Sequence, residues 1–133
     1  MVIGESIGNG YPMAAVVTSP TLAAPFDAGV DGSPVACAAA LAVLGVMENE
    51  HLADSAMQTG KGLRDAVRAL GLTVRGAGLC LEIDVPSAKD VAARLRDSRV
   101  LIATRANTLL FRPPLTFSAP DTSAFVEAVR SSL

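Results

Sequence analysis

The chain has 133 residues, half of them apolar, and carries a formal net charge of −2 with only five aromatic residues. This length suits one hydrophobic core, built here mainly from Ala, Val and Leu. The arginines form no basic stripe, which argues against a nucleic-acid partner. The most apolar segment, residues 35–47, is shorter than the ~20 residues that span a bilayer, and the first residues lack a signal-peptide pattern. We therefore expect no membrane partner and a cytoplasmic location.

The two cysteines and the single histidine do not form a metal-binding pattern. Cys37 and Cys80 lie alone inside apolar runs, and this predicts two buried thiols in a reducing compartment. His51 follows Glu50 at a helix junction and is interpreted as a solvated capping residue. With one histidine and no cysteine cluster, no metal site is expected.

The first half of the chain is predicted to hold a short strand, a loop and a long helix. Residues 14–18 are apolar and partly β-branched, which predicts a short buried strand. Residues 19–32 are rich in Pro and Gly and predict a loop with one helical turn near Leu22. Ser33 followed by Pro34 predicts a capped helix start. The helix that follows is apolar on nearly every face until Glu48, so other protein surface should cover it.

The second half changes from helical to mixed patterns. Residues 51–70 predict an amphipathic helix with Leu63, Val67 and Leu70 inward, ended by Gly71. Residues 73–85 predict two strand pieces that bend at glycines. Two further strands are expected at 100–103 and 108–112.

Two serine motifs predict the last helices. Ser87 with Asp90 resembles a capping box and opens a helix to about Ser98, and Ser118 with Asp121 opens the last one. The apolar residues expected to face inward on these helices are Val91, Leu95, Phe125 and Val129. The fold class is therefore α/β, with an α+β unit over residues 72–133.

Four blocks of the sequence resemble, in order, the C-terminal part of class III aminotransferases. They are IGNGYPMAAVVT, GSPVACAAALAVLGVMENEHL, VRGAGLCLEI and NTLLFRPPLTFS. These enzymes use pyridoxal phosphate and have fold type I. The resemblance implies three segments: residues 1–33 as a remnant of the large cofactor-binding domain, 34–71 as a long helical connection, and 72–133 as the small C-terminal domain. It covers only the last third of such enzymes.

The resemblance places Glu5 where the family has the lysine that binds the cofactor aldehyde. That chemistry needs a nucleophilic amine, and a carboxylate cannot form an imine. Lys61 and Lys89 are the only lysines and lie on predicted exposed helix positions far from Glu5 in sequence. No catalytic residue is therefore expected to be intact, and we expect no covalent binding of pyridoxal phosphate.

Other positions suggested by the family are weaker or absent. Aligned on Pro34, Gly29 occupies the position of a threonine that contacts the cofactor phosphate, and the hydroxyl is missing. The remaining phosphate-binding, ring-stacking and pyridine-nitrogen groups fall before Met1 by this resemblance. Arg112 matches an arginine that commonly pairs with the substrate carboxylate; a surface arginine at a strand end is the structural alternative. Arg75 is interpreted as an exposed or locally paired strand residue.

Three functions are compatible with these residues. The chain is a truncated class III aminotransferase-like protein without transamination of its own; or it is a binding or assembly module; or it is an active transaminase whose site a second chain completes. The expected partner is a second copy in a homodimer, or an N-terminal aminotransferase chain. Loss of the amine disfavours the third function most.

Overall fold

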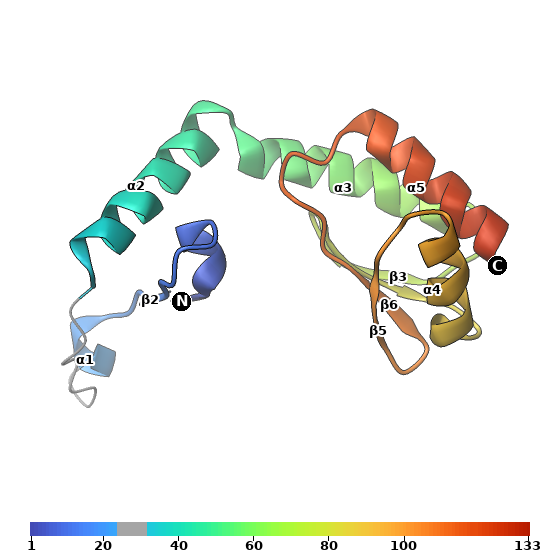
Figure 1. The fold of residues 1–133 in the computed structure, drawn as a ribbon, viewed down its shortest axis with the longest axis horizontal. Helices are drawn as coiled ribbons and strands as arrows, with labels where there is room; N and C mark the ends of the chain where they lie inside the picture. The colour runs from blue at the N-terminus through green and yellow to red at the C-terminus, as the bar shows by residue number, and fades with distance from the viewer. Residues whose placement is uncertain (24–31) are drawn as a thin grey trace. The chain divides into compact units, whose positions relative to one another are not determined.

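The computed structural model describes residues 1–23 and 32–133, which form two compact units: unit 1, Met1–His51, and unit 2, Leu52–Leu133 (Figure 1). Each unit is described by itself. We expected boundaries at residues 33 and 71, whereas the compact units meet between His51 and Leu52. The apolar face of helix α3 (Leu52–Arg68) packs into the core of unit 2, which explains why this helix belongs to that unit. Whether 1–33, 34–71 and 72–133 match the domains of a complete enzyme stays a prediction.

Unit 1 begins with a tight turn between two short strands. Strand β1 (Val2–Ile3) pairs antiparallel with β2 (Ala15–Val16), and the 3-10 helix η1 (Glu5–Gly8) lies between them. The predicted strand at 14–18 is confirmed in shortened form, but its burial is wrong, because Val16 is 68% exposed. A pair of two-residue strands has no sheet face that another layer could cover.

Two helices follow in the described part of unit 1. The helical turn expected near Leu22 is α1 (Pro20–Ala23), and the long helix is α2 (Pro34–Asn49). Pro34 occupies the first turn as predicted, but the Ser33 side chain makes no capping hydrogen bond. Helix α2 packs against η1 and buries only Ala36 and Ala40.

Unit 2 is a four-stranded antiparallel sheet in the order β3-β4-β6-β5 with helices packed against it. Its strands are β3 (Val74–Ala77), β4 (Cys80–Asp84), β5 (Ala103–Arg105) and β6 (Thr108–Phe111), and its helices are α3 (Leu52–Arg68), α4 (Ala88–Asp97) and α5 (Ala119–Ser132). The mixed helix and sheet architecture confirms the predicted fold class. No single described helix is long and apolar enough to cross a membrane; only α2 and α3 taken together, as a bent pair, reach that length and composition.

One face of the sheet carries the core and the other is polar. Leu81 and Ile83 of β4 and Leu109 and Phe111 of β6 are buried with the inward residues of the three helices. Side chains alternate between faces along a strand, so the residues between them point to the other face. The predicted inward residues Leu63, Val67, Val91, Leu95, Phe125 and Val129 are all buried, whereas Leu70 is partly buried.

The same alternation corrects the prediction of two buried thiols. Cys80 is exposed because it occupies the polar face of β4, and Cys37 is only half-buried on α2. An apolar run alone does not specify which face of a strand or helix another layer covers.

The expected strand at 100–103 begins later than predicted, at Ala103. Residue Arg99 has a left-handed backbone with φ +62°, and the Val100 amide donates to the Leu95 carbonyl at 2.8 Å. These residues therefore finish α4 in a Schellman motif before the strand starts.

The two predicted capping boxes differ. Ser118 and Asp121 form a complete box at the start of α5. At α4, the Ser87 hydroxyl donates to the Asp90 carboxylate at 2.7 Å, and the Ser87 side chain caps no backbone amide. The prediction of a capping box at Ser87 was therefore wrong in its hydrogen bonding, although the helix begins at Ala88 as the spacing of Ser87 and Asp90 indicated.

Candidate functional site

The turn in unit 1 is held by its own backbone. The amides of Ile7, Asn9 and Tyr11 donate to the carbonyls of Gly4, Ser6 and Gly8 at 3.3, 3.1 and 3.0 Å. Asn9 and Gly10 have positive φ angles of 47° and 95°. Because Asn tolerates and Gly readily adopts this conformation, the Asn-Gly pair allows the chain to reverse here.

The flanking strands fix where this turn begins and ends. The Met1 amino group donates to the Val17 carbonyl at 2.6 Å, and the Val17 amide donates to the Met1 carbonyl at 2.8 Å. Glu5 is the first residue of η1, which Gly4 separates from β1. The paired strands therefore hold both ends of the turn that contains residue 5. An open cavity of about 530 Å³ at this turn is lined by Gly4, Ser6, Gly10, Tyr11 and Pro12.

Two other predicted positions, Gly29 and Arg112, lie outside this turn in the sequence. Gly29 lies outside the described residues, within 24–31. Arg112 belongs to unit 2, where it follows β6 directly and is exposed. Glu5 and Arg112 therefore belong to different units.

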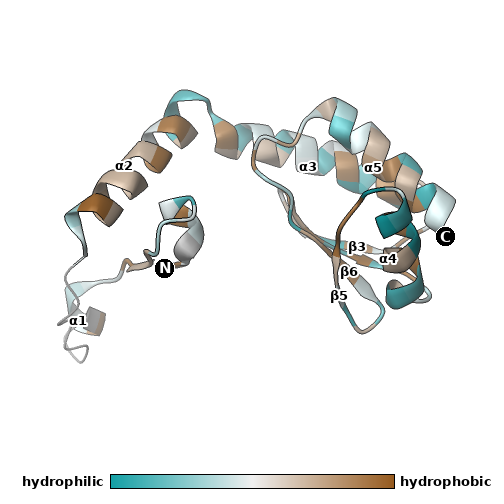
Figure 2. Ribbon diagram, in the orientation of Figure 1, coloured by the Kyte–Doolittle hydropathy of each residue, from teal (hydrophilic) through white to brown (hydrophobic). Residues whose placement is uncertain are grey.

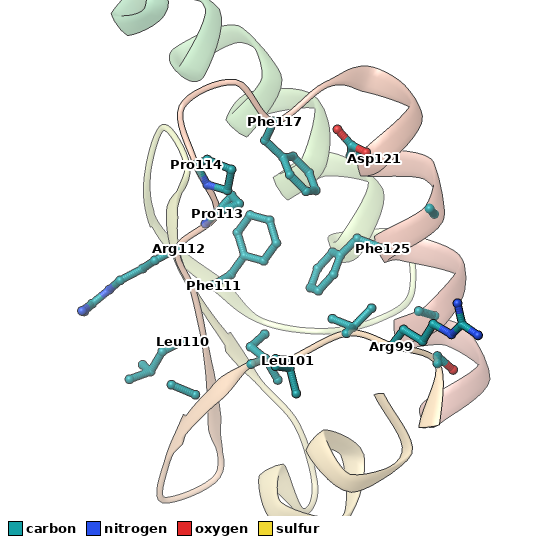
Figure 3. Close-up of a pocket in the computed structure, with 16 residues that line it drawn as sticks. Arg99, Leu101, Leu110, Phe111, Arg112, Pro113, Pro114, Phe117, Asp121 and Phe125 are labelled. Carbon is teal, nitrogen blue, oxygen red and sulfur yellow. The ribbon is translucent and has the colours of Figure 1, made fainter. Parts of the chain in front are cut away.

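Arg112 lies at the rim of a groove in unit 2, and its side chain points away from it (Figure 3). No carboxylate of the described residues is within ion-pair distance of its guanidinium. Pro113 and Pro114 follow and restrict the backbone beside it. Its guanidinium fork is therefore available to an external anion.

The groove itself was not foreseen from the sequence. It has a volume of about 640 Å³, and the aromatic residues that line it are Phe111, Phe117 and Phe125. The Phe111 ring centroid is 5.3 Å from that of Phe117 and 4.5 Å from that of Phe125. The alternation of β6 could have placed Phe111 inward, but the approach of α5 depends on contacts distant in sequence.

The polar face of the sheet carries a charge ladder, which we define as Arg75, Asp84, Glu82, Arg105 and Thr108. Arg75 donates to both oxygens of Asp84, one at 2.8 Å, and lies 3.7 Å from Glu82. Arg105 donates to Glu82 at 2.6 Å, and the Thr108 hydroxyl donates to Asp84 at 2.9 Å. Arg75 is thus a locally paired strand residue, as predicted.

Hydrogen bonding within the charge ladder changes the acidity of its members. The bonds from Arg75 and Thr108 lower the pKa of Asp84, and the bond to Asp84 raises the pKa of Arg75. Arg75 and Arg105 are exposed and their carboxylate partners are only half-buried, so these ion pairs stabilise the sheet only weakly. The charge ladder is explained as cross-strand pairing and needs no catalytic role.

The remaining candidate groups, Lys61, Lys89 and His51, are all exposed. Lys61 on α3 and Lys89 on α4 are exposed, as predicted, and both belong to unit 2. His51 is exposed with φ +51°. Within residues 1–23 and 32–133, no group of three metal-ligating side chains lies close enough to hold an ion.

Comparison with known proteins identifies the family. The fold and the ordered motifs are those of a pyridoxal-phosphate aminotransferase of fold type I, and the family "Aminotransferase class-III" matches residues 1–133. The chain belongs to this family. The acetylornithine aminotransferase of Mycobacterium tuberculosis is 34% identical over all of this chain and 36% of its own length. The ornithine aminotransferase of Oceanobacillus iheyensis is 27% identical over 99% of this chain and 36% of its own length.

Solved structures agree with the sequence relatives. The ornithine aminotransferase of Toxoplasma gondii superposes with a TM-score of 0.84 at 28% identity, covering 98% of this chain and 35% of its own, and is described with pyridoxal phosphate partly occupying its active site. The acetylornithine aminotransferase of Elizabethkingia anophelis gives a TM-score of 0.84 at 26% identity, with 98% and 39% covered. This chain therefore spans little more than a third of the length of the enzymes it matches.

The residues of the turn do not fit the covalent chemistry of pyridoxal phosphate. An imine requires a primary amine, and unit 1 has no lysine. Both lysines lie on helices of unit 2. We therefore derive no reaction step through this cofactor.

Proposed function

We propose that this chain forms the C-terminal part of a class III aminotransferase-type site and does not catalyse transamination by itself. The observation that carries the proposal is Glu5, at the start of η1, where the resemblance places the imine-forming lysine. A carboxylate at this position removes covalent catalysis, because it has no nitrogen to bond to the aldehyde carbon. The coverage of the relatives is consistent with a partial site.

Arg112 is the residue we assign to substrate binding. It is exposed and free of the ion pairs that engage Arg75 and Arg105. A planar guanidinium with free donors suits a carboxylate in bidentate geometry. The substrate group that Arg112 binds is accordingly a carboxylate of an amino acid or keto acid.

Two measurements test the proposal. The purified chain, mixed with pyridoxal phosphate, an ω-amino donor and pyruvate, should give no turnover above free cofactor. Binding of a small dicarboxylate, followed by NMR shifts, should weaken up to about fivefold in Arg112→Gln, the range of one exposed ion pair. The conservative Arg112→Lys variant should retain part of the affinity, and Arg130→Gln, on exposed α5, should change nothing.

Steady turnover by the isolated chain would contradict the proposal that it does not catalyse transamination by itself. Equal dicarboxylate shifts in wild type and Arg112→Gln would remove the substrate role of Arg112. Turnover that arises only when an N-terminal aminotransferase segment is added would favour the third function, in which a second chain completes the site.

An assembly role is a second candidate, favoured by the surface of α2. Val35, Leu41, Leu44 and Val46 are exposed on this helix, and Figure 2 shows apolar colouring along its length. Large apolar surfaces usually mark an interface. Aminotransferases of this family are typically dimeric, so the partner we propose is a second copy or an N-terminal aminotransferase chain.

A further inference from the structure

The sheet of unit 2 ends in two edge strands, β3 and β5, and side chains of α3 occupy the edge of β3. In an antiparallel ladder, alternate residues of an edge strand direct their N–H and C=O groups away from the sheet. The Val74 carbonyl of β3 accepts from Arg68 of α3 at 3.1 Å. The Gly76 carbonyl accepts from Arg64 of the same helix at 3.4 Å. These arginines therefore close the β3 edge to a further strand.

The opposite edge, at β5, is open. All three residues of this strand, Ala103–Arg105, are exposed. Arg105 and Thr108 flank the two-residue turn between β5 and β6, and such a flanking pair exchanges hydrogen bonds across the hairpin. The next residue, Thr104, therefore turns its N–H and C=O outward. In the described part of the chain, no side chain and no loop amide donates to the Thr104 carbonyl.

Apolar surface and open space lie beside the β5 edge. Residues 100–103, which lead into β5, line the groove of about 640 Å³ and also a second cavity of about 330 Å³ that α4 helps to form. Leu101 lines both cavities and is 81% exposed. Figure 3 shows it at the groove with Phe111 and Phe125. A strand added to an open edge pairs through its backbone and covers such surface with alternate side chains.

The charged groups around this edge are mainly cationic. Arg96 lines the smaller cavity, and Arg99 and Arg112 line the groove on opposite sides (Figure 3). No described carboxylate lies within ion-pair distance of these three guanidinium groups. Asp121, which also lines the groove, accepts hydrogen bonds from Ser118 in the capping box. The edge is therefore complementary to a partner that carries carboxylates.

A second copy of this chain is a poor partner for the same edge. Residues 99–105 contain Arg99 and Arg105 and no acidic residue. Pairing two such segments would bring the arginines of both chains together, and like charges across an interface oppose association. A homodimer through α2, as proposed above, does not need this edge.

We propose that the open edge of β5 docks an extended strand of a different polypeptide, with alternating apolar side chains and acidic ends. Backbone hydrogen bonds to Thr104 hold the strand in register with the sheet. Its apolar side chains cover Leu101 and the groove, and its carboxylates face Arg96 and Arg99. This docking site goes beyond the proposed function and does not depend on it.

The probe is a fluorescently labelled synthetic peptide, Glu-Thr-Val-Thr-Val-Thr-Glu, mixed with the full chain. Fluorescence anisotropy measures its dissociation constant, and amide hydrogen exchange measures the protection of Thr104. We expect saturable binding, slower exchange of the Thr104 amide, and weaker binding of the matched peptide Lys-Thr-Val-Thr-Val-Thr-Lys. Arg96→Gln should weaken binding of the acidic peptide up to about fivefold, the range of one exposed ion pair.

A variant of the edge itself separates strand pairing from general adhesion. Thr104→Pro removes the outward N–H and leaves the hydrogen bonds of Ala103 and Arg105 to β6 in place. It should weaken peptide binding about tenfold, because one backbone hydrogen bond is lost and the ring obstructs the strand. Thr104→Val keeps the amide and should bind like the wild type. A circular-dichroism spectrum equal to the wild type verifies that Thr104→Pro folds.

Modified peptides test the same pairing without changing the protein. Two versions of the acidic peptide are N-methylated at alternate amides, one set in each version, and only one version should lose binding, because only one set faces the β5 edge. Equal affinities of these two versions, or of Thr104→Pro and the wild type, would overturn the docking site. Equal affinities of the acidic and lysine-ended peptides would overturn the acidic character of the partner. Protection of Thr104 that grows with chain concentration in the absence of peptide would assign the edge to a second copy and would also overturn the proposal.

Discussion

Carboxylates on the surface of unit 2 owe their acidity to local donors. The Arg75 and Thr108 hydrogen bonds lower the pKa of Asp84, and the Ser118 hydroxyl and amide lower that of Asp121 from its ordinary value of 3.8. A depressed pKa in the folded state contributes stability above the ordinary value, and the contribution is lost as the pH falls through the folded pKa. Both groups therefore weaken the fold below about pH 4.

Replacement of Arg75 should raise the pKa of Asp84. In Arg75→Gln the charged donor is gone, so the Asp84 carboxyl should titrate nearer to 3.8 while the bond from Thr108 keeps it slightly low. NMR titration of the carboxyl carbons measures this directly, and Asp121, on a different element, serves as the internal control. An unchanged Asp84 titration would show that the ion pair of the charge ladder does not form in solution.

Arg99 occupies a backbone conformation that suits glycine. Its φ of +62° lies at the first residue beyond the α4 cap, where the Arg99 amide donates to the Arg96 carbonyl at 2.9 Å. Arg99→Gly should raise the free energy of unfolding by about 0.5–1 kcal/mol, because glycine adopts this region without a Cβ clash. Thermal or urea unfolding measures the change.

The matched control for this prediction is Arg96→Gly. Arg96 lies inside α4, where glycine should lower stability by about 0.5–1 kcal/mol. Destabilisation by both variants would mean that the Arg99 side chain contributes more than its backbone strain costs.

Helix α3 and the β3–β4 hairpin make a close backbone contact. A Cβ built on Gly60 would lie 1.9 Å from the Gly78 carbonyl oxygen, and both residues belong to unit 2. Gly78 itself has a positive φ of 52° in the two-residue turn. The Arg64 and Arg68 side chains of α3 donate to the Gly76 and Val74 carbonyls of β3 at 3.4 and 3.1 Å, which holds the helix at this distance.

Gly60→Ala should therefore separate α3 from the hairpin. We expect a loss of about 1–3 kcal/mol of unfolding free energy, since a methyl group has no space against a backbone carbonyl. Gly62→Ala is the matched control on the same helix, because its Cβ would meet nothing within 4 Å. That change should stabilise by about 0.5–1 kcal/mol through helix propensity. Similar effects of the two variants would refute the close approach.

Across the molecule, the buried apolar cluster lies in unit 2, whereas most of the exposed large apolar side chains lie in unit 1. Every member of the buried core cluster, from Ala56 to Val129, belongs to unit 2. Unit 1 instead exposes apolar side chains on α2, which has no charged residue between Pro34 and Met47. Water contact with that surface is unfavourable by roughly 25 cal/mol per Å², which is the physical reason to expect association through unit 1.

The full chain should self-associate in a concentration-dependent manner. Leu41 and Leu44, 69% and 47% exposed, lie on α2, and the double change Leu41→Glu and Leu44→Glu should shift light scattering toward the monomer mass. Leu101→Glu is the control, since Leu101 is 81% exposed but lies in unit 2. A monomer for the wild type across micromolar concentrations, without binding of an apolar dye, would exclude the homodimer.

Local chemistry was readable from the sequence alone. Capping residues and glycines predicted the starts of the helices at Pro34 and Ala119 and the helix end at Gly71. The helical spacing of apolar residues predicted the buried faces of α3, α4 and α5. These signals involve residues only a few positions apart. The family and the carboxylate at residue 5 were equally visible, because motif order and residue identity need no folding.

Tertiary structure alone decided the features that join distant segments. The exposure of Cys80, the side-chain bond between Ser87 and Asp90, the late start of β5 and the aromatic groove at Phe111 were not fixed by local pattern. Each depends on which face of the sheet the helices cover and on how closely α3 and α5 approach it. That packing is set by contacts between segments many residues apart. A pattern within one segment therefore predicts an element but does not predict which other elements pack against it.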